Sequence, residues 1–201
     1  MEIIFATHNR HKLLEAVAIA GASCVVSGLD AIGCFEEIPE TANTLYGNSQ
    51  QKATYVYQKY GVNCFADDTG LEIDALNGRP GVFSARYAGP QCNARDNLLK
   101  VMEEMKNQTV RTARFKTVIT LIINGQTYQF EGKVEGEIIT QERGGAGFGY
   151  DPIFCPNGYP CTFSEMSEHE KNAVSHRGQA LRKMFHFLRT SYLPSHTKNN
   201  V

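Results

Sequence analysis

Residues 115–138, FKTVITLIINGQTYQFEGKVEGEI, contain two strand patterns that are separated by only two residues. The separating pair, Asn124-Gly125, is favoured in type I′ hairpin turns because both central positions of that turn require a positive φ. On the second strand one face carries Tyr128, Phe130, Gly132, Val134, Gly136 and Ile138, and polar residues alternate with them. The stretch therefore predicts a long antiparallel hairpin with one apolar and one polar face.

The segments around this hairpin have helical and strand patterns in roughly equal measure. Apolar strand patterns lie at residues 2–6, 24–26 and 62–66, the last running into Asp67-Asp68-Thr69-Gly70. A helical pattern of apolar residues begins from Lys12. A second follows the candidate N-caps at 41–43 and ends before Gly61, and two more cover 93–105 and 176–189. Helices combined with both alternating and continuous strands predict an α/β protein with a mixed sheet.

The charge of the chain restricts its partners. Its 201 residues include 20 Lys and Arg against 21 Asp and Glu, which gives a net charge of −1. We therefore expect neither nucleic acid nor a membrane as the main partner, because both call for a basic excess. The charges are unevenly distributed, with nine acidic and two basic residues in 13–78 but six basic and no acidic residues in 171–201. This distribution favours a small anionic substrate that carries a metal ion.

The N-terminal residues and the cysteines indicate the compartment. No basic start followed by an apolar segment opens the chain, and no apolar stretch approaches the ~20 residues of a membrane span. Six cysteines occur without a Cys-x-x-Cys pair. We expect a cytoplasmic protein with reduced thiols and no structural zinc site.

A polar connection between the first strand and the first helix is the first candidate site. It comprises Thr7, His8, Asn9, Arg10, His11 and Lys12. Free N–H groups and the positive end of a helix favour phosphate at such a place, and a bound anion would explain a lysine there. The alternative is an ordinary polar connection, and the Gly-x-x-x-x-Gly-Lys pattern of a Walker loop is absent.

A group of acidic residues is the second candidate. Asp67 and Asp68 follow an apolar strand, and Glu40 precedes the second helix. Adjacent aspartates repel each other unless a cation or hydrogen-bond donors lie nearby, and Mg²⁺ binds through one or two carboxylates, waters and substrate phosphates. The alternative is a solvated Asp-Asp-Thr-Gly turn.

Two further clusters lie near the C-terminus. The glycine-rich loop 144–149 would let Phe148 stack on a flat ligand while Asp151 accepts hydrogen bonds, unless Phe148 is simply a core residue. Lys171, His176 and Arg177 lie at a helix start, which is either a site for an anionic or carbonyl-rich ligand or a solvated basic face. A Ser175–His176 nucleophile pair is disfavoured, because adjacent residues seldom have the required geometry.

Five stretches together resemble the inosine triphosphate pyrophosphatase family, over almost the whole chain. They are FATHNRHKLLE at 5–15, ETANTLYGNSQQKA at 40–53, ADDTGLEIDALNGRPGVFSARYAG at 66–89, GFGYDPIF at 147–154 and EKNAVSHRGQAL at 170–181. The resemblance implies a two-lobed α/β fold with a central mixed, twisted sheet and an active-site cleft between the lobes. One catalytic domain would cover 1–190, with a disordered polar tail at 191–201.

The resemblance also implies an activity and its requirements. The expected reaction is hydrolysis of the non-canonical purine triphosphates ITP, dITP and XTP to a monophosphate and pyrophosphate, which cleanses the nucleotide pool. Mg²⁺ is the expected cofactor, with Mn²⁺ as a substitute, and a homodimer is the expected assembly. Two rivals stay open: another Mg²⁺-dependent phosphohydrolase, acting on terminal phosphates, and a non-catalytic nucleotide-binding module.

The resemblance assigns roles by position. Residues from Thr7 to Lys12 and Lys171 would grip the triphosphate, Glu40 and Asp68 would hold the metal, and Asp68 would also accept a proton. Substrate contacts would come from Thr69, Gly149 and Tyr150, base stacking from Phe148, and base recognition from Asp151, His176 and Arg177. The chain departs from the usual pattern at four positions, namely His8, Ala42, Gly47 and Thr69.

Overall fold

The computed structural model describes residues 1–192. Its principal elements are β1 (Glu2–Phe5), α1 (Arg10–Ala20), β2 (Val25–Ser27), α2 (Leu45–Tyr60), β3 (Cys64–Ile73), β4 (Pro80–Gly81), α3 (Ala94–Glu104), β5 (Thr112–Ile123), β6 (Gln126–Ile138), β7 (Phe154–Pro156), α4 (Glu168–Val174) and α5 (His176–Ser191). The tail predicted at 191–201 lies, beyond Tyr192, outside the described residues.

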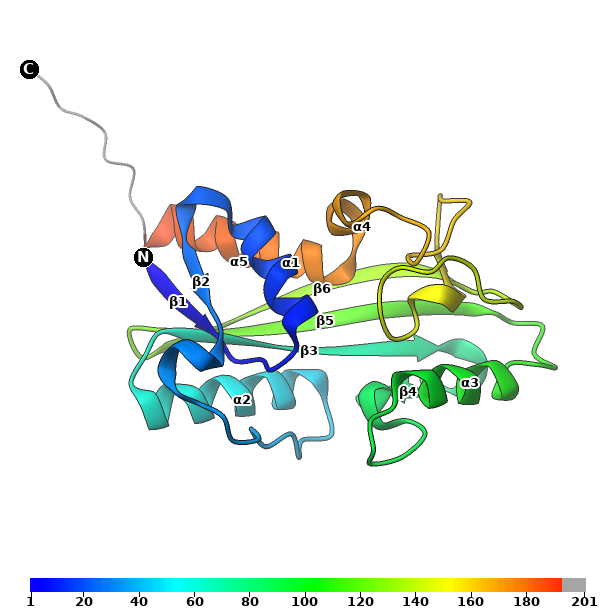
Figure 1. Ribbon diagram of the computed structural model, residues 1–201, viewed down its shortest axis with the longest axis horizontal. Coiled ribbons are helices and arrows are strands. Elements are labelled where there is room, and N and C mark those ends of the chain that lie inside the picture. Colours follow the sequence, from blue (N-terminus) through cyan, green and yellow to red (C-terminus); the bar gives the residue numbers. More distant parts are fainter. Residues whose placement is uncertain (193–201) are drawn as a thin grey trace, which may run out of the picture.

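The predicted hairpin is confirmed and forms the centre of the molecule. Ile123 pairs with Gln126 across the turn, and Asn124 and Gly125 have φ values of 50° and 77°. β5 pairs with β6 along its whole length and with β3 from Ala113 to Ile122. These three strands run from one end of the molecule to the other, so both halves share them (Figure 1).

The sheet is mixed, as predicted. Its strand order is β2-β1-β3-β5-β6-β7, with β4 on β3. β1 is parallel to β2 and β3, whereas the other pairs are antiparallel. β5 occupies one edge of β3, so β1 and β4 share the other edge, at Cys64–Phe65 and Leu71–Glu72. Among the described residues, no strand pairs with 66–70 on that edge, which leaves a window in the sheet.

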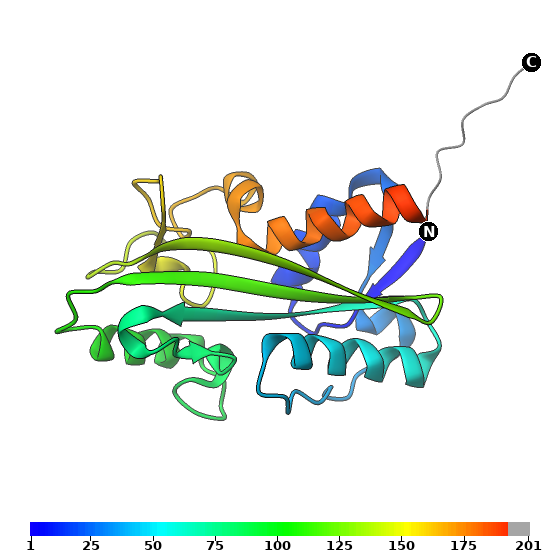
Figure 2. The same ribbon diagram turned by 180° about the vertical axis from the view of Figure 1, so that it is seen from behind.

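Helices cover both faces of the sheet. α1 and α5 lie over one face, and α2 and α3 lie end to end over the other (Figures 1 and 2). α1 and α5 pack on Phe5 and Phe65, and α2 packs on Cys64 and Ala66. The predicted core positions of α5, namely Ala180, Leu181, Met184, Phe185 and Leu188, are all buried.

Several elements differ from the sequence prediction, including β4 and β7, which were not predicted, and α2, whose N-cap is Thr44 and not a residue of 41–43. The strand expected at 62–66 continues as β3 to Ile73, so the aspartates lie within a strand and not in a solvated turn after it. α4 was not predicted, although Ser167 and Glu170 form a capping box that marks its start. All six cysteines are free thiols. Within residues 1–192, no helix combines the length and apolar character that crossing a membrane requires.

The close approach of α5 to β6 at Gly132 gives a first prediction. A Cβ atom there would lie 1.9 Å from the His176 carbonyl oxygen and 2.7 Å from the Ala180 nitrogen. Gly132→Ala should therefore lower the free energy of unfolding by about 3 kcal/mol, since backbone must move. Urea denaturation checks this, with Gly145→Ala as the control because nothing lies within 4 Å of a Cβ there. Equal stability of the two variants would contradict the predicted clash.

Candidate functional site

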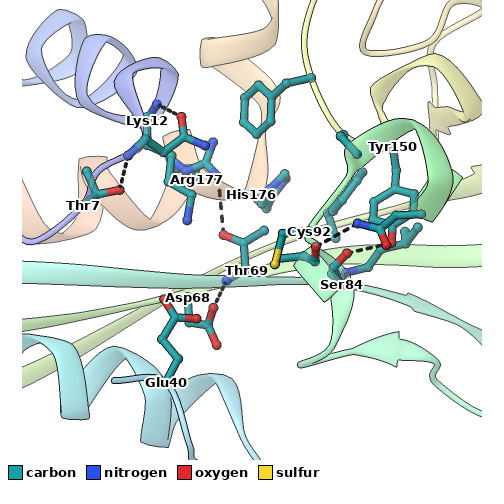
Figure 3. A pocket seen from close by; sticks show the side chains of 18 of the residues that line it. Thr7, Lys12, Glu40, Asp68, Thr69, Ser84, Cys92, Tyr150, His176 and Arg177 are labelled. Atoms are coloured by element: carbon teal, nitrogen blue, oxygen red, sulfur yellow. Dashed lines mark hydrogen bonds between the residues drawn. The ribbon is translucent and has the colours of Figure 1, made fainter. Parts of the chain in front are cut away.

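The window in the sheet opens into a cavity of about 470 Å³. Its walls come from the loop after β1, the middle of β3, the glycine-rich loop and the start of α5 (Figure 3). Fourteen of the predicted site residues line it, namely Thr7, His8, Asn9, Lys12, Glu40, Asp68, Thr69, Phe148, Gly149, Tyr150, Asp151, Lys171, His176 and Arg177. Arg10 and His11 do not form part of the wall, although the His11 ring stacks on Phe148 at a centroid distance of 5.6 Å.

The loop after β1 leads directly into α1. Asn9 is the N-cap of this helix, because its Oδ1 accepts hydrogen bonds from the backbone N–H groups of His11 and Lys12. The helix therefore begins at Arg10, earlier than predicted, and Lys12 lies in its first turn. The Lys12 Nζ reaches Asp67 Oδ1 at 2.9 Å.

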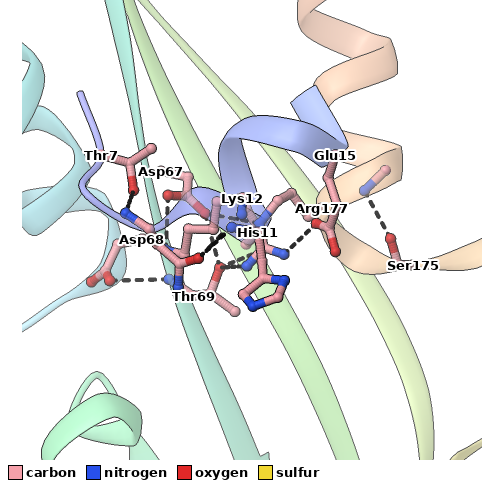
Figure 4. Close-up of polar contacts among 12 residues, drawn as sticks. Thr7, His11, Lys12, Glu15, Asp67, Asp68, Thr69, Ser175 and Arg177 are labelled. Carbon is pink, nitrogen blue, oxygen red and sulfur yellow. Dashed lines mark hydrogen bonds and ion pairs between the residues drawn. The ribbon is translucent and has the colours of Figure 1, made fainter. Parts of the chain in front are cut away.

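Asp67 and Asp68 are adjacent in β3, so their side chains point to opposite faces of the sheet (Figure 4). Asp67 is 1% exposed and lies between Lys12 and Arg177, whose Nε donates to Asp67 Oδ2 at 3.1 Å. Burial alone would raise the pKa of Asp67, but the charges of Lys12 and Arg177 outweigh it and hold that pKa well below its usual value. The expected repulsion between the two aspartates is thus relieved by separation and by cations.

Asp68 faces α2 and meets a different set of partners. Its Oδ2 accepts from Asn48 Nδ2 at 3.0 Å, and its Oδ1 accepts from the backbone N–H of Thr69 at 3.0 Å. Burial raises the pKa of Asp68 above its ordinary value, against the opposing charges of Lys52 and Lys12. An elevated pKa is what a carboxylate needs in order to accept a proton near neutral pH.

Lys52 is a site residue that the sequence reasoning missed. Its Nζ lies 2.6 Å from Glu40 Oε1 and 4.0 Å from Asp68 Oδ1, so the two predicted metal carboxylates converge on one cation. Burial alone would lower the pKa of Lys52, but the charges of Asp68 and Glu40 raise it instead. The only sequence signal was its place in the segment ETANTLYGNSQQKA, since one lysine in a helix usually lies on a solvated face.

Glu40 and Asp68 fit a hard divalent cation. Within residues 1–192, no group of three or more His, Cys, Asp or Glu side chains is arranged to hold a metal ion. A site for Mg²⁺ does not need such a group, because Mg²⁺ takes one or two carboxylates and completes its shell with water and substrate phosphates. The present pair already holds the ammonium of Lys52 between its members.

The glycine-rich loop and α4 meet at the other end of the cavity. Asp151 Oδ2 accepts from the Phe148 backbone N–H at 2.8 Å and from Lys171 Nζ at 2.6 Å. The Lys171 Nζ lies 4.6 Å from the centroid of the Phe148 ring. Arg177 forms a separate ion pair with Glu15 at 2.5 Å. Lys171 therefore lies in the cavity wall beside Phe148 and Asp151, which the resemblance assigns to the base.

His176 is buried at the start of α5. Its ring stacks on Phe115 at a centroid distance of 4.6 Å and an interplanar angle of 11°. Its Nδ1 is the one buried side-chain nitrogen or oxygen among the described residues without a hydrogen-bond partner. Burial, together with the charges of Arg177 and Lys171, lowers the pKa of His176 well below its usual value, so the ring is neutral at pH 7. Ser175 instead caps α5 by accepting from the backbone N–H of Gly178.

Comparisons with known proteins agree with this architecture. Residues 3–187 match the sequence model of the Ham1 family. The chain is 51% identical to a protein of Flavobacterium psychrophilum named dITP/XTP pyrophosphatase, over 94% of this chain and 100% of that one. Two solved structures are similar, a HAM1 protein from Coxiella burnetii (36% identity, TM-score 0.87, covering 95% of this chain and 100% of that one) and the Staphylococcus aureus Ham1 protein (34% identity, TM-score 0.86, 94% and 99%).

The buried, neutral His176 gives a prediction about pH. The unfolded chain binds a proton at this residue below about pH 6.5 and the folded chain does not, so the free energy of unfolding falls as the pH falls through that value. Between pH 7.5 and pH 5.5, the free energy of unfolding of His176→Phe should fall by about 1 kcal/mol less than that of the wild type. Urea denaturation of both proteins at the two pH values measures the difference. The same pH dependence in both would contradict a neutral, buried imidazole.

Proposed function

This chain belongs to the Ham1 family, and we propose that it hydrolyses the non-canonical purine nucleoside triphosphates dITP, XTP and ITP. It is a nucleoside triphosphate pyrophosphatase, so its products are the nucleoside monophosphate and pyrophosphate. This activity removes deaminated purine nucleotides from the pool from which DNA and RNA are made.

The observation that carries the proposal is that Glu40 and Asp68 converge on one cationic group, the ammonium of Lys52, in the wall of the cavity. A triphosphate has about four negative charges near neutral pH and cannot be buried without cations. The cavity wall supplies the ammonium groups of Lys12, Lys52 and Lys171. Bound Mg²⁺, or Mn²⁺ in its place, would be held by Glu40 and Asp68 and would supply further neutralisation of the phosphates.

Asp68 would act on the attacking water. Its carboxylate orients a water molecule toward the α-phosphorus and accepts one of its protons as the new P–O bond forms. The bond between the α-phosphorus and the bridging oxygen breaks, and its electron pair leaves with pyrophosphate. Lys12 and the loop that begins at Thr7 would stabilise the negative charge that develops on the leaving group.

The opposite end of the cavity would bind the base. The Phe148 ring stacks on the purine, and Asp151, His176 and Arg177 contact its edge. Hypoxanthine and xanthine present an acceptor oxygen where adenine presents a donor amine, so donors from His176 and Arg177 favour the first two bases. Buried hydrogen bonds can discriminate by roughly 10⁴ in such sites.

Assembly and location complete the proposal. We propose that the protein works as a homodimer. We also propose that it is located in the cytoplasm, a reducing compartment in which its six free cysteines would stay reduced. Sedimentation equilibrium of the purified chain would test the dimer, and a single species of monomer mass would exclude it.

The proposed function predicts Mg²⁺-dependent release of pyrophosphate from dITP, XTP and ITP. The measurement is product analysis across these three nucleotides, GTP and ATP, with and without Mg²⁺. We expect kcat/KM for ATP to be lower than that for ITP by 10² or more. Release of orthophosphate without pyrophosphate would identify a phosphatase of terminal phosphates, and tight nucleotide binding without turnover would identify a binding module.

Asp68→Asn should preserve the fold and lower kcat by about 10² or more, because the amide cannot accept a proton from water. Steady-state kinetics with ITP, together with urea denaturation, separates lost chemistry from lost stability. Asp30→Asn, at an exposed position, is the control and should retain wild-type turnover. Near-normal turnover of Asp68→Asn would remove Asp68 from the role of base.

A further inference from the structure

The two carboxylates of the site come from different parts of the chain, although Ile38 near Glu40 packs against the apolar cluster that includes Ala66 of β3. Asp68 belongs to β3, whereas Glu40 lies in the irregular segment 33–44 that precedes α2. Their separation is therefore set by whatever connects that segment to the strand. Lys52 pairs with both charges, but an ammonium on a four-carbon stem does not fix the orientation of either carboxylate.

Asn48 makes the connection with fixed geometry. It lies one turn before Lys52 on the same face of α2 and is 0% exposed. Its Nδ2 donates to Asp68 Oδ2 at 3.0 Å, and its Oδ1 accepts from the backbone N–H of Ala42 at 2.9 Å. A backbone N–H can only donate and a carboxylate can only accept, so the two partners define the amide orientation.

A close contact between the segment and the helix lets Asn48 reach both partners. A Cβ atom on Gly47 would lie 2.6 Å from the Ala42 Cβ, so the segment approaches α2 where Gly47 has no side chain. The two departures from the usual family pattern, Ala42 and Gly47, are thus complementary, and the Ala42 methyl fills the space. The approach holds the Ala42 N–H against Asn48.

We propose that Asn48 is a positioning residue that sets the distance and orientation of Asp68 relative to Glu40, so that one divalent cation on a nucleotide meets both carboxylates. This inference rests on the proposed function. Hydrogen bonds from residues outside the coordination shell commonly orient the ligands of a metal, and their loss costs 10- to 100-fold in affinity or activity. The hydrogen bonds of Asn48 to Asp68 and to the Ala42 N–H would act in this way.

The neighbouring residues of α2 provide matched controls. Ser49 is also 0% exposed, and its hydroxyl shares a 2.8 Å hydrogen bond with Thr120, away from both carboxylates. Gln51 holds the same segment as Asn48 does, because its Oε1 accepts from the Thr41 N–H at 2.9 Å, but it has no hydrogen bond to Asp68. Ser49→Ala therefore reports the loss of a buried hydrogen bond in α2, and Gln51→Ala reports a loosened segment alone.

The test compares Asn48→Leu with these two variants in two measurements. The first is Mn²⁺ binding, followed by electron paramagnetic resonance in the presence of a non-hydrolysable α,β-imido analogue of dITP. The second is the kinetics of pyrophosphate release from dITP. We expect Asn48→Leu to bind Mn²⁺ at least 10-fold more weakly and to lose at least 10-fold in kcat with less than a threefold change in KM, while Ser49→Ala matches the wild type.

Amide hydrogen exchange at Ala42 adds a readout that requires no activity. The Ala42 N–H should exchange faster in Asn48→Leu than in the wild type or Ser49→Ala, because its acceptor is gone. If Asn48→Leu does not fold, Asn48→Ser provides the same comparison, since a serine hydroxyl is too short to reach Asp68.

The outcomes separate the two proposals. Wild-type protein that releases no pyrophosphate would overturn the proposed function, and the role of Asn48 with it. Active wild-type protein alongside folded Asn48→Leu with unchanged Mn²⁺ affinity and kcat would overturn only the inference. An equal loss in Gln51→Ala would also overturn it, because the effect would then come from the segment and not from Asp68.

Discussion

Compensation of buried charge on β3 is the constraint on which the rest of the structure depends. Asp67 is held on one face of the strand by Lys12 of α1 and Arg177 of α5, and Asp68 is held on the other face by Asn48 and Lys52 of α2. A buried charge that loses its partner is strongly destabilising. Two consecutive residues therefore fix the positions of three helices against the sheet. Of the groups in these ion pairs, Lys12, Lys52, Asp68 and Arg177 line the cavity.

The elements that could be predicted are those whose signals are local. The hairpin was recognisable because Asn124-Gly125 determines its turn and its second strand has a two-residue period. β3 was predicted too short, because Asp67-Asp68-Thr69-Gly70 has the composition of a turn. The strand continues through these residues because helices distant in the sequence satisfy their polar side chains. α4 was overlooked although its capping box is visible in the sequence.

The candidate site shows the same division. Residues with unusual local patterns, such as Asp68 and the glycine loop around Phe148, could be identified from the sequence, and the structure brings them to one cavity. Lys52 and Asn48 could not, because a lysine and an asparagine inside a polar helix are ordinary. Their importance arises from packing of α2 against β3, which buries both. Likewise the sequence does not show that Lys171 lies against Asp151, since 20 residues separate them.

The ion pair between Glu15 and Arg177 spans 162 residues of the chain. During synthesis the ribosome releases Lys12, Glu15 and Asp67 long before Arg177 leaves the exit tunnel, so Arg177 cannot yet pair with either acid. The cleft is thus among the last parts of the molecule to assemble, and contacts of such long range slow the final folding step. A chain truncated before α5 would lose His176 and Arg177 from the wall of the cavity, and a nucleotide that binds in that cavity would stabilise only the full-length protein.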